Sequence, residues 1–361
     1  MPWDYGLYRT NLIYLGGEMY NSEKHVTSSY QAFERQFSFE GTSQEHFQSW
    51  QDAFRPRLRS ILGLDNLESD LRNHIPIATL KETHDMGSYD REHWEITVEP
   101  TVPLPFYLLR PKSLPETPPL VLTPHGHNHP HLYVGIAETD AEALHITSGD
   151  HDIAVQAVQE GYVVISPTTR AFGDTRTLTA IEAGQVSSCR DQLVHGLLAG
   201  RTPIGERVWD ISCLISWALT NIDVDKNRIG ITGNSGGGTI SLFAAACDTR
   251  ISVSMPGCYF CTFKGSIGSI NHCECNYVPG LLRLAEMSDV AGLIAPRPFI
   301  AIAGREDDIF PIEEVRTAFS DLKRIYSVAG VPEHCTLYVG NGGHRYYKDG
   351  AWPSLEHYFS T

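Results

Sequence analysis

A serine flanked by glycines is the feature of this 361-residue chain best suited to covalent chemistry. Ser235 follows the apolar run 228–232, with Gly233 before it and Gly236 and Gly237 after it. A serine hydroxyl is a weak nucleophile until a histidine can take its proton, and enzymes present it on a tight strand-to-helix turn. Small neighbours leave room for that turn, and the N–H of Gly236 would point at a developing oxyanion.

The sequence on both sides distinguishes such a turn from an ordinary glycine-rich loop. Ile229 and Ile231 lie before the turn as in a buried strand, and the small-residue run 239–247 follows as a helix-compatible segment. Strand, turn and helix together favour a nucleophilic Ser235 over the loop interpretation.

Two later loops carry the partners that a serine nucleophile needs. The first contains Asp307 and Asp308, and the second places His344 after a pair of glycines. A histidine base takes the serine proton, and a carboxylate fixes the tautomer of that histidine and stabilises its charged form. The spacing between Gly304 and Pro311 favours Asp307 as the acid, with Asp308 as the alternative.

These residues must be positioned by a sheet. Six short apolar runs are typical of buried parallel strands, and helical patterns separate most of them. The runs are 119–123, 162–166, 228–232, 251–255, 299–303 and 336–339. The sequence therefore predicts an α/β fold with a doubly wound, mostly parallel sheet. Alternating residues within 94–110 predict two antiparallel edge strands in addition. In such sheets, functional side chains gather at the carboxyl ends of the strands.

Two regions are expected to flank or cover this sheet. Residues 1–75 are predicted to form an N-terminal helical extension, with 76–361 as the catalytic domain. A capping box at 42–45 begins a helix whose apolar residues recur at helical spacing. Those residues are Phe47, Trp50, Phe54, Leu58, Ile61 and Leu62. We expect this stripe to pack on the catalytic domain, or alternatively on a second subunit in a homo-oligomer.

The segment 258–292 is predicted to form a lid or a pocket wall. It contains Tyr259, Phe260 and Tyr277, which we expect to contact substrate. Their bulk predicts a small acyl pocket, whereas packing in a core beneath the lid is the alternative.

Composition excludes several other classes of protein. The formal net charge of −15 would repel nucleic acid. No stretch of 18 apolar residues occurs, and the first residues lack a basic region followed by an apolar run. We therefore expect a soluble, cytoplasmic protein that binds neither nucleic acid nor a membrane.

Histidines and cysteines form two clusters that could bind a metal. Four histidines alternate within 125–131, but in an irregular loop without a tetrahedral ligand set. Cys258 and Cys261 are followed by Cys273 and Cys275, which approaches a zinc spacing, although the second pair is atypical. Buried thiols are the favoured interpretation, so we predict no metal and no cofactor and leave the cysteine alternative open.

Several of these motifs together resemble the α/β-hydrolase superfamily, in its dienelactone-hydrolase-like and acetylxylan-esterase-like branch. The matching segments are His125-Gly126, Arg170 to Gly173, the lead-in 223–229, Ala295 to Pro298, and Gly304 to Pro311. The resemblance covers roughly residues 75–361. It implies Ser235 as nucleophile, His344 as base, Asp307 as acid, and the N–H groups of Gly236 and His127 as the oxyanion hole.

The same resemblance implies a reaction. Dienelactone hydrolases proper have a cysteine at the turn, so Ser235 favours ester cleavage. We expect a carboxylic-ester hydrolase acting on short-chain acyl esters, with acetylated sugars or oligosaccharides as candidate substrates. Arg170 is expected either to contact substrate or to pair with a core carboxylate.

Two other functions remain as alternatives. A serine peptidase of prolyl-oligopeptidase type shares the order of catalytic residues, but no repeat of propeller length occurs. A catalytically silent binding protein is disfavoured by the intact Ser-Asp-His set.

Overall fold

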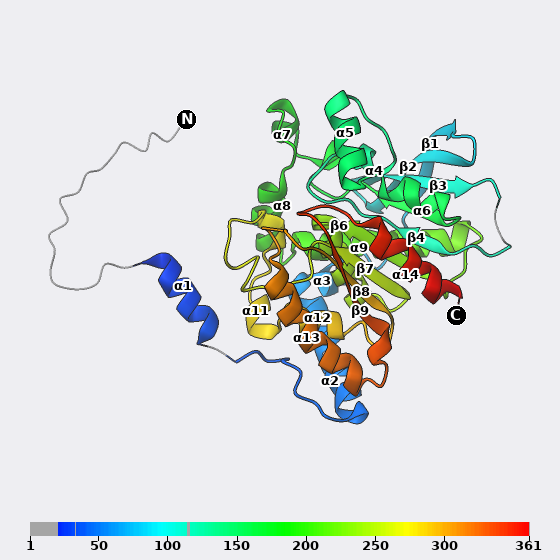
Figure 1. Ribbon diagram of the computed structural model, residues 1–361. Coiled ribbons are helices and arrows are strands. Elements are labelled where there is room, and N and C mark those ends of the chain that lie inside the picture. The colour runs from blue at the N-terminus through cyan, green and yellow to red at the C-terminus, as the bar shows by residue number, and fades with distance from the viewer. Residues whose placement is uncertain (1–20, 33, 114–115, 361) are drawn as a thin grey trace, which may run out of the picture. The chain divides into compact units, whose positions relative to one another are not determined.

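The computed structural model of the chain describes residues 21–32, 34–113 and 116–360 (Figure 1). Chain contacts divide it into two units, residues 1–34 and 35–361. In the first unit, helix α1 (Ser22–Gln31) is capped by Asn21, whose side chain accepts the N–H of Lys24 at 2.8 Å.

Nine strands form one sheet in the described part of the second unit. They are β1 (Ala78–Asp85), β2 (Tyr89–Glu99), β3 (Val102–Pro111), β4 (Leu120–Leu122), β5 (Val163–Pro167), β6 (Ile229–Asn234), β7 (Val253–Gly257), β8 (Phe299–Gly304) and β9 (Cys335–Gly340). Their order is β1-β2-β3-β5-β4-β6-β7-β8-β9. Strands β4 to β9 pair in parallel and coincide with the six predicted runs, so the predicted fold class is confirmed.

The antiparallel end of the sheet differs from the prediction. β2 and β3 are present, but β3 also pairs antiparallel with β5, so it is not an edge strand. The edge is β1, which pairs with β2. Nearly all residues of β1 are exposed, so the sequence there lacks the apolar alternation that would have revealed it.

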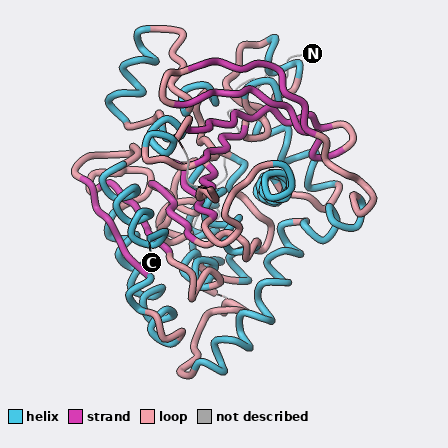
Figure 2. The backbone as a smooth tube through the Cα atoms, turned by 90° about the vertical axis from the view of Figure 1, so that its right-hand side faces the viewer, coloured by secondary structure: helices cyan, strands magenta, loops and turns pink. Residues whose placement is uncertain are grey.

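Helices cover both faces of the sheet (Figures 1 and 2). They are α2 (Gln44–Leu62), α3 (Leu64–Asp70), α4 (Pro130–Tyr133), α5 (Asp140–Gly149), α6 (Ile153–Gln159), α7 (Leu178–Glu182), α8 (Cys189–Leu198), α9 (Pro203–Asn221), α10 (Gly236–Cys247), α11 (Leu281–Leu284), α12 (Met287–Gly292), α13 (Ile312–Val328) and α14 (Lys348–Ser360). Short 3₁₀ turns are η1 (Gly173–Thr175), η2 (Glu274–Asn276) and η3 (Pro332–His334).

The two faces have separate cores, as strand geometry requires. Along β4, Leu120 and Leu122 point into a core shared with α2, α9, α10, α12 and α13. Val121 points to the opposite face, into a core shared with α4, α6 and α14. Successive strand residues face opposite sides, so a strand that is apolar throughout must be buried on both.

Helix α2 packs its apolar stripe into the first of these cores. Phe47, Phe54, Leu58 and Leu62 are buried there with residues of the sheet. The helix is capped by Ser43, whose hydroxyl accepts the N–H of His46 at 3.2 Å, one residue later than the predicted box. By contacts, residues 35–75 belong with the catalytic unit. The predicted boundary at residue 75 and the homo-oligomer stay predictions, and residues 1–20 lie outside the described range.

Within residues 21–32, 34–113 and 116–360, no helix combines the length and the apolar character needed to span a bilayer.

Candidate active site

Ser235 occupies a strained turn between β6 and α10. Its backbone has φ +57° and ψ −117°, outside the regions that L-residues favour. The turn is held by the N–H of Ser235, which donates to the carbonyl of Gly257 on β7 at 2.8 Å. Ser235 is partly exposed, whereas its neighbours in the turn are buried. Such a turn lifts a hydroxyl above the end of the sheet.

The glycines around Ser235 are required by close backbone contacts. A methyl group on Gly233 or Gly237 would lie 2.2 or 2.1 Å from the carbonyl oxygen of Pro124. A methyl group on Gly238 would lie 2.6 Å from the oxygen of Gly257. The sequence motif therefore reflects the tight packing of this turn against the ends of β4 and β7.

His344 and Asp307 meet at the ends of the two neighbouring strands, β9 and β8. The Nδ1 atom of His344 lies 2.9 Å from Oδ2 of Asp307, whose side chain is 1% exposed. The other oxygen of Asp307 accepts the N–H groups of Ile309 at 2.9 Å and Phe310 at 3.1 Å. Asp308 is exposed. Of the two adjacent carboxylates, Asp307 is therefore the one that contacts the histidine.

Ser235 and His344 line one pocket of about 370 Å³. Its lining also includes Gly126, His127, Asn128, His145, His151, Asn234, Gly236, Thr239, Tyr259, Ile270, Asn271, His272, Cys273, Asn276, Ile309 and Phe310. Most of these side chains can form hydrogen bonds. The histidines are the only lining side chains, among the residues that the structure describes, that can carry a positive charge.

The loop after β4 reaches the nucleophile turn. A methyl group on Gly126 would lie 2.6 Å from the oxygen of Asn234 and 3.2 Å from the nitrogen of Gly236. One on Gly236 would lie 3.2 Å from the ring of His127. The two residues predicted to form the oxyanion hole, Gly236 and His127, are thus neighbours.

His125 holds this loop in place from beneath. Its Nδ1 lies 2.8 Å from the carbonyl of Gly126, and its Nε2 accepts the N–H of Thr169 at 2.9 Å. The Thr169 hydroxyl donates to the carbonyl of His125 at 3.0 Å. Complete burial lowers the pKa of His125 to about 3, so its ring is neutral.

Of the four residues predicted to contact substrate, only Tyr259 lines the pocket. The other three, Phe260, Tyr277 and Arg170, lie elsewhere. Phe260 is buried and packs edge-to-face on Phe299, with ring centroids 5.1 Å apart. Tyr277 is exposed, and its hydroxyl donates to the carbonyl of Ile267 at 3.1 Å. Arg170 is buried in a separate ion network.

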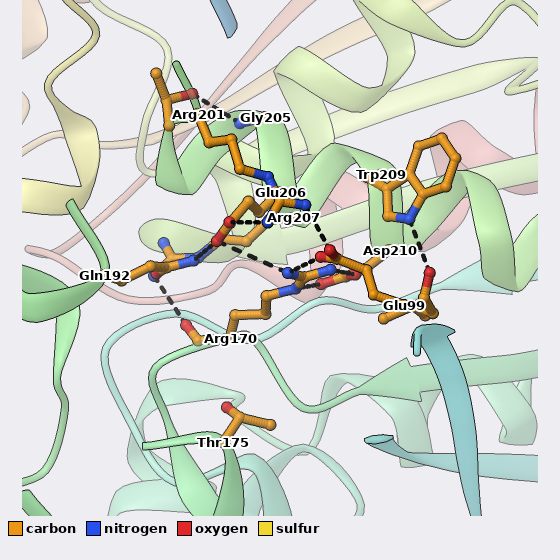
Figure 3. A network of polar contacts seen from close by, with 12 residues as sticks. Glu99, Arg170, Thr175, Gln192, Arg201, Gly205, Glu206, Arg207, Trp209 and Asp210 are labelled. Atoms are coloured by element: carbon orange, nitrogen blue, oxygen red, sulfur yellow. Dashed lines mark hydrogen bonds and ion pairs between the residues drawn. The ribbon is translucent and has the colours of Figure 1, made fainter. Parts of the chain in front are cut away.

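That network links β2, the loop after β5 and helix α9 (Figure 3). Arg170 donates to both oxygens of Asp210, at 2.8 and 2.6 Å, and to Glu99 at 2.5 Å. Glu99 also accepts from Arg201 at 2.6 Å. Burial opposes the charge on Arg170, but the surrounding carboxylates raise the pKa of its guanidinium. Arg170 is therefore paired with core carboxylates, which was the alternative to a contact with substrate.

Several pocket residues were missed by the sequence interpretation. Phe310 stacks on the His344 ring, with centroids 5.8 Å apart and planes at 21°. The ring centroid of His272 lies 5.3 Å from that of Phe310, and its Nε2 lies 2.9 Å from the hydroxyl oxygen of Ser266. Asn234 precedes the nucleophile in the motif itself, and its buried Oδ1 has no hydrogen-bond partner among the described residues. Only Phe310 and Asn234 could have been noticed, because they adjoin recognised motifs.

The segment 258–292 supplies six residues of the pocket lining, from Tyr259 to Asn276. Whether it acts as a lid or as a fixed wall stays a prediction.

Three groups of described residues have the types and spacing to bind a cation. One combines His127, Cys189, Cys273 and Cys275, and a second consists of His131, Glu138 and Glu142. The third, Cys258 with Asp307 and His344, belongs to the site above. Cys261 joins none of them.

Comparison with known proteins places the chain in a family. The sequence model of the Abhydrolase family matches residues 22–346, and the chain belongs to that family. A curated relative, "Putative hydrolase YtaP" of Bacillus subtilis (strain 168), is 27% identical over 243 residues. That match covers 66% of this chain and 77% of the relative.

Solved structures of esterases share the fold. A putative acetyl xylan esterase from Bacteroides fragilis matches with a TM-score of 0.73 and 18% identity, over 95% of this chain and 86% of that one. A glucuronoyl esterase from Solibacter usitatus matches with a TM-score of 0.62 and 13% identity, over 86% and 92%. An acetyl xylan esterase from Paenibacillus sp. R4 matches with a TM-score of 0.56 and 15% identity, over 82% of this chain and 94% of that one. The resemblance to the α/β-hydrolase superfamily and its fold are thereby confirmed.

Proposed function

We propose that this protein is a serine carboxylic-ester hydrolase that cleaves short-chain acyl esters through an acyl-enzyme. The observation that carries the proposal is the placement of Ser235 on its strained turn in the same pocket as His344, with the imidazole held by buried Asp307. The hydrolase and esterase names of the relatives support the reaction class.

Each group has a step to perform. Ser235 Oγ attacks the ester carbonyl while Nε2 of His344 takes its proton, and Asp307 stabilises the resulting imidazolium through Nδ1–H. The N–H groups of Gly236 and His127 receive the negative charge on the carbonyl oxygen. The imidazolium then protonates the leaving alcohol, and water activated by the same histidine hydrolyses the acyl-enzyme.

The pocket favours a polar alcohol group. Asn128, Asn271, Asn276 and His272 offer both donors and acceptors around a space of about 370 Å³. A carbohydrate hydroxyl surface can pair with such groups, whereas a long alkyl chain would leave them unpaired. Acetylated sugars or oligosaccharides are therefore the proposed substrates, in agreement with the acetyl xylan esterase names among the structural relatives.

The proposal is tested with p-nitrophenyl acetate, acetylated xylo-oligosaccharides and a peptide amide, assayed beside a Ser235→Ala control. Turnover of the acetyl esters, absent in the control, is expected. Amide turnover that exceeds ester turnover would replace the proposal with the peptidase alternative. Absence of turnover and of labelling by a fluorophosphonate would favour the silent binding protein.

A further inference from the structure

A cluster of three thiols and one imidazole lies beside the candidate active site. The ligand atoms of His127, Cys189, Cys273 and Cys275 all lie within 4.8 Å of one another. The Sγ of Cys275 is 3.3 Å from Nε2 of His127. Four donors bound to zinc at about 2.0 to 2.3 Å in a tetrahedron would be separated by about 3.5 to 3.8 Å. The cluster is therefore close to the size of a structural zinc site.

The four residues come from three separate segments. His127 is in the loop after β4, Cys189 is the first residue of α8, and Cys273 and Cys275 flank the start of turn η2. Cys189 and Cys275 are 1% and 2% exposed. Spacing along the chain groups Cys273 and Cys275 with Cys258 and Cys261 instead, because nothing in the sequence connects them to Cys189.

A buried arginine next to the cluster supplies an independent observation. Arg207 on α9 is 3% exposed and donates to the Cys189 sulfur at 3.4 Å (its position is labelled in Figure 3). Its other partners are the carbonyl of Arg170 at 3.0 Å, Oε1 of Gln192 at 3.2 Å, the side chain of Cys275, and the face of the Phe172 ring, whose centroid lies 5.7 Å from Cζ. The nearby carboxylates of α9, Glu206 and Asp210, pair with Arg170 instead. Among the described residues, the Nε of Arg207 has no partner.

A buried cation requires a counter-charge nearby. Neutral thiols would not supply one, whereas thiolates would, and three thiolates this close together would repel one another unless a cation lay between them. A divalent zinc ion with three thiolates and a neutral imidazole carries one net negative charge, which matches the single charge of Arg207.

We propose that His127, Cys189, Cys273 and Cys275 bind a structural zinc ion. Four protein ligands close the coordination sphere, so the ion has no open position for water or substrate. Its effect is to join the loop after β4, the start of α8 and turn η2. Because His127 and Cys273 also line the pocket, the ion fixes one wall of the candidate active site. Arg207 supports it by donating to a ligating sulfur.

The test measures metal directly and is independent of catalysis. Full-length protein expressed in zinc-supplemented medium and purified under reducing conditions is analysed by elemental mass spectrometry. About one zinc per chain is expected for wild type and for the control Cys261→Ala, which removes a buried thiol outside the cluster, and less than about a tenth for Cys275→Ala and Cys273→Ala. Circular dichroism checks that each variant is folded.

A second measurement does not depend on folded variants. Wild-type protein reconstituted with cobalt is expected to show sulfur-to-cobalt charge transfer and the visible bands of tetrahedral thiolate coordination. Zinc-free wild type after reconstitution, a native disulfide among the three cysteines, or equal metal loss in Cys261→Ala would each overturn the proposal. None of these outcomes bears on the role of Ser235.

Discussion

Asp307 and Asp308 are adjacent in the chain, but only Asp307 contacts His344. Asp307→Asn keeps the shape of the side chain but removes the charge that stabilises the imidazolium and fixes its tautomer. We expect kcat to fall by about 10⁴-fold. The matched control Asp308→Asn alters an exposed carboxylate and should change kcat by less than about threefold. Ester hydrolysis by both purified variants checks this, and a larger loss in Asp308→Asn would reassign the acid.

His125 makes stability depend on pH. Its pKa is about 3 in the fold because of burial, against about 6.5 when unfolded, so below pH 6.5 the unfolded chain binds more protons. Stability should therefore fall as the pH falls from about 6.5 towards 3, by up to about 1.4 kcal/mol per pH unit from this residue.

The variant His125→Gln removes the titrating group and can still accept the N–H of Thr169. Urea unfolding at several pH values should give a flatter dependence for the variant than for wild type. The same slope in both proteins would show that His125 is already protonated, or equally solvated, in the fold.

At the residue scale, the sequence was sufficient to predict a site residue where a motif imposes its own geometry. Ser235 and its glycines carry that signal because any side chain at Gly233 or Gly237 would collide with Pro124. Phe260, by contrast, is apolar and adjacent to Tyr259, so its sequence cannot show that it packs on Phe299 and not in the pocket. That distinction depends on how the loop after β7 folds over the sheet.

At the element scale, the network around Arg170 joins β2 to α9, and we expect it to be needed for stability. Arg170→Met would leave Asp210 and Glu99 buried without their shared partner. Breaking a buried ion pair in this way costs about 3 to 5 kcal/mol of unfolding free energy. The control Arg228→Met removes a partly exposed pair with Asp225 and should cost less than about 1 kcal/mol. Urea titrations measure the free energy of unfolding of both variants. Equal losses would show that the buried network contributes no more to stability than the partly exposed pair.

Buried strands could be predicted from the sequence, whereas an exposed strand could not. β4, β5 and β6 are buried throughout, so their apolar runs stand out from the sequence. β1 is exposed along nearly all of its length and is specified by its pairing with β2, which the sequence does not display. The zinc ligands illustrate the same limit, because Cys189 reaches Cys275 only through the packing of α8 against η2.

At the scale of the whole molecule, the size of the pocket predicts selectivity for short acyl groups. Tyr259 and Phe310, whose ring centroids lie 5.4 Å apart, both line the pocket that contains Ser235 and His344. An added methylene in a filled pocket costs about 1 to 3 kcal/mol through overpacking. We expect kcat/KM to fall at least tenfold from acetyl to butyryl p-nitrophenyl esters and further to octanoyl. A profile that rises with chain length would indicate an open apolar groove and contradict the acetyl-ester proposal.

The central claim is that Ser235 is the nucleophile, and covalent labelling tests it most directly. Wild-type protein is treated with a fluorophosphonate, weighed intact by mass spectrometry, digested and sequenced to find the modified residue. The account predicts a single adduct on Ser235 of the wild-type protein and no labelling of a folded Ser235→Ala variant. The kcat of that variant should be lower than that of wild type by several orders of magnitude. An adduct on another residue, or undiminished labelling of Ser235→Ala, would contradict it.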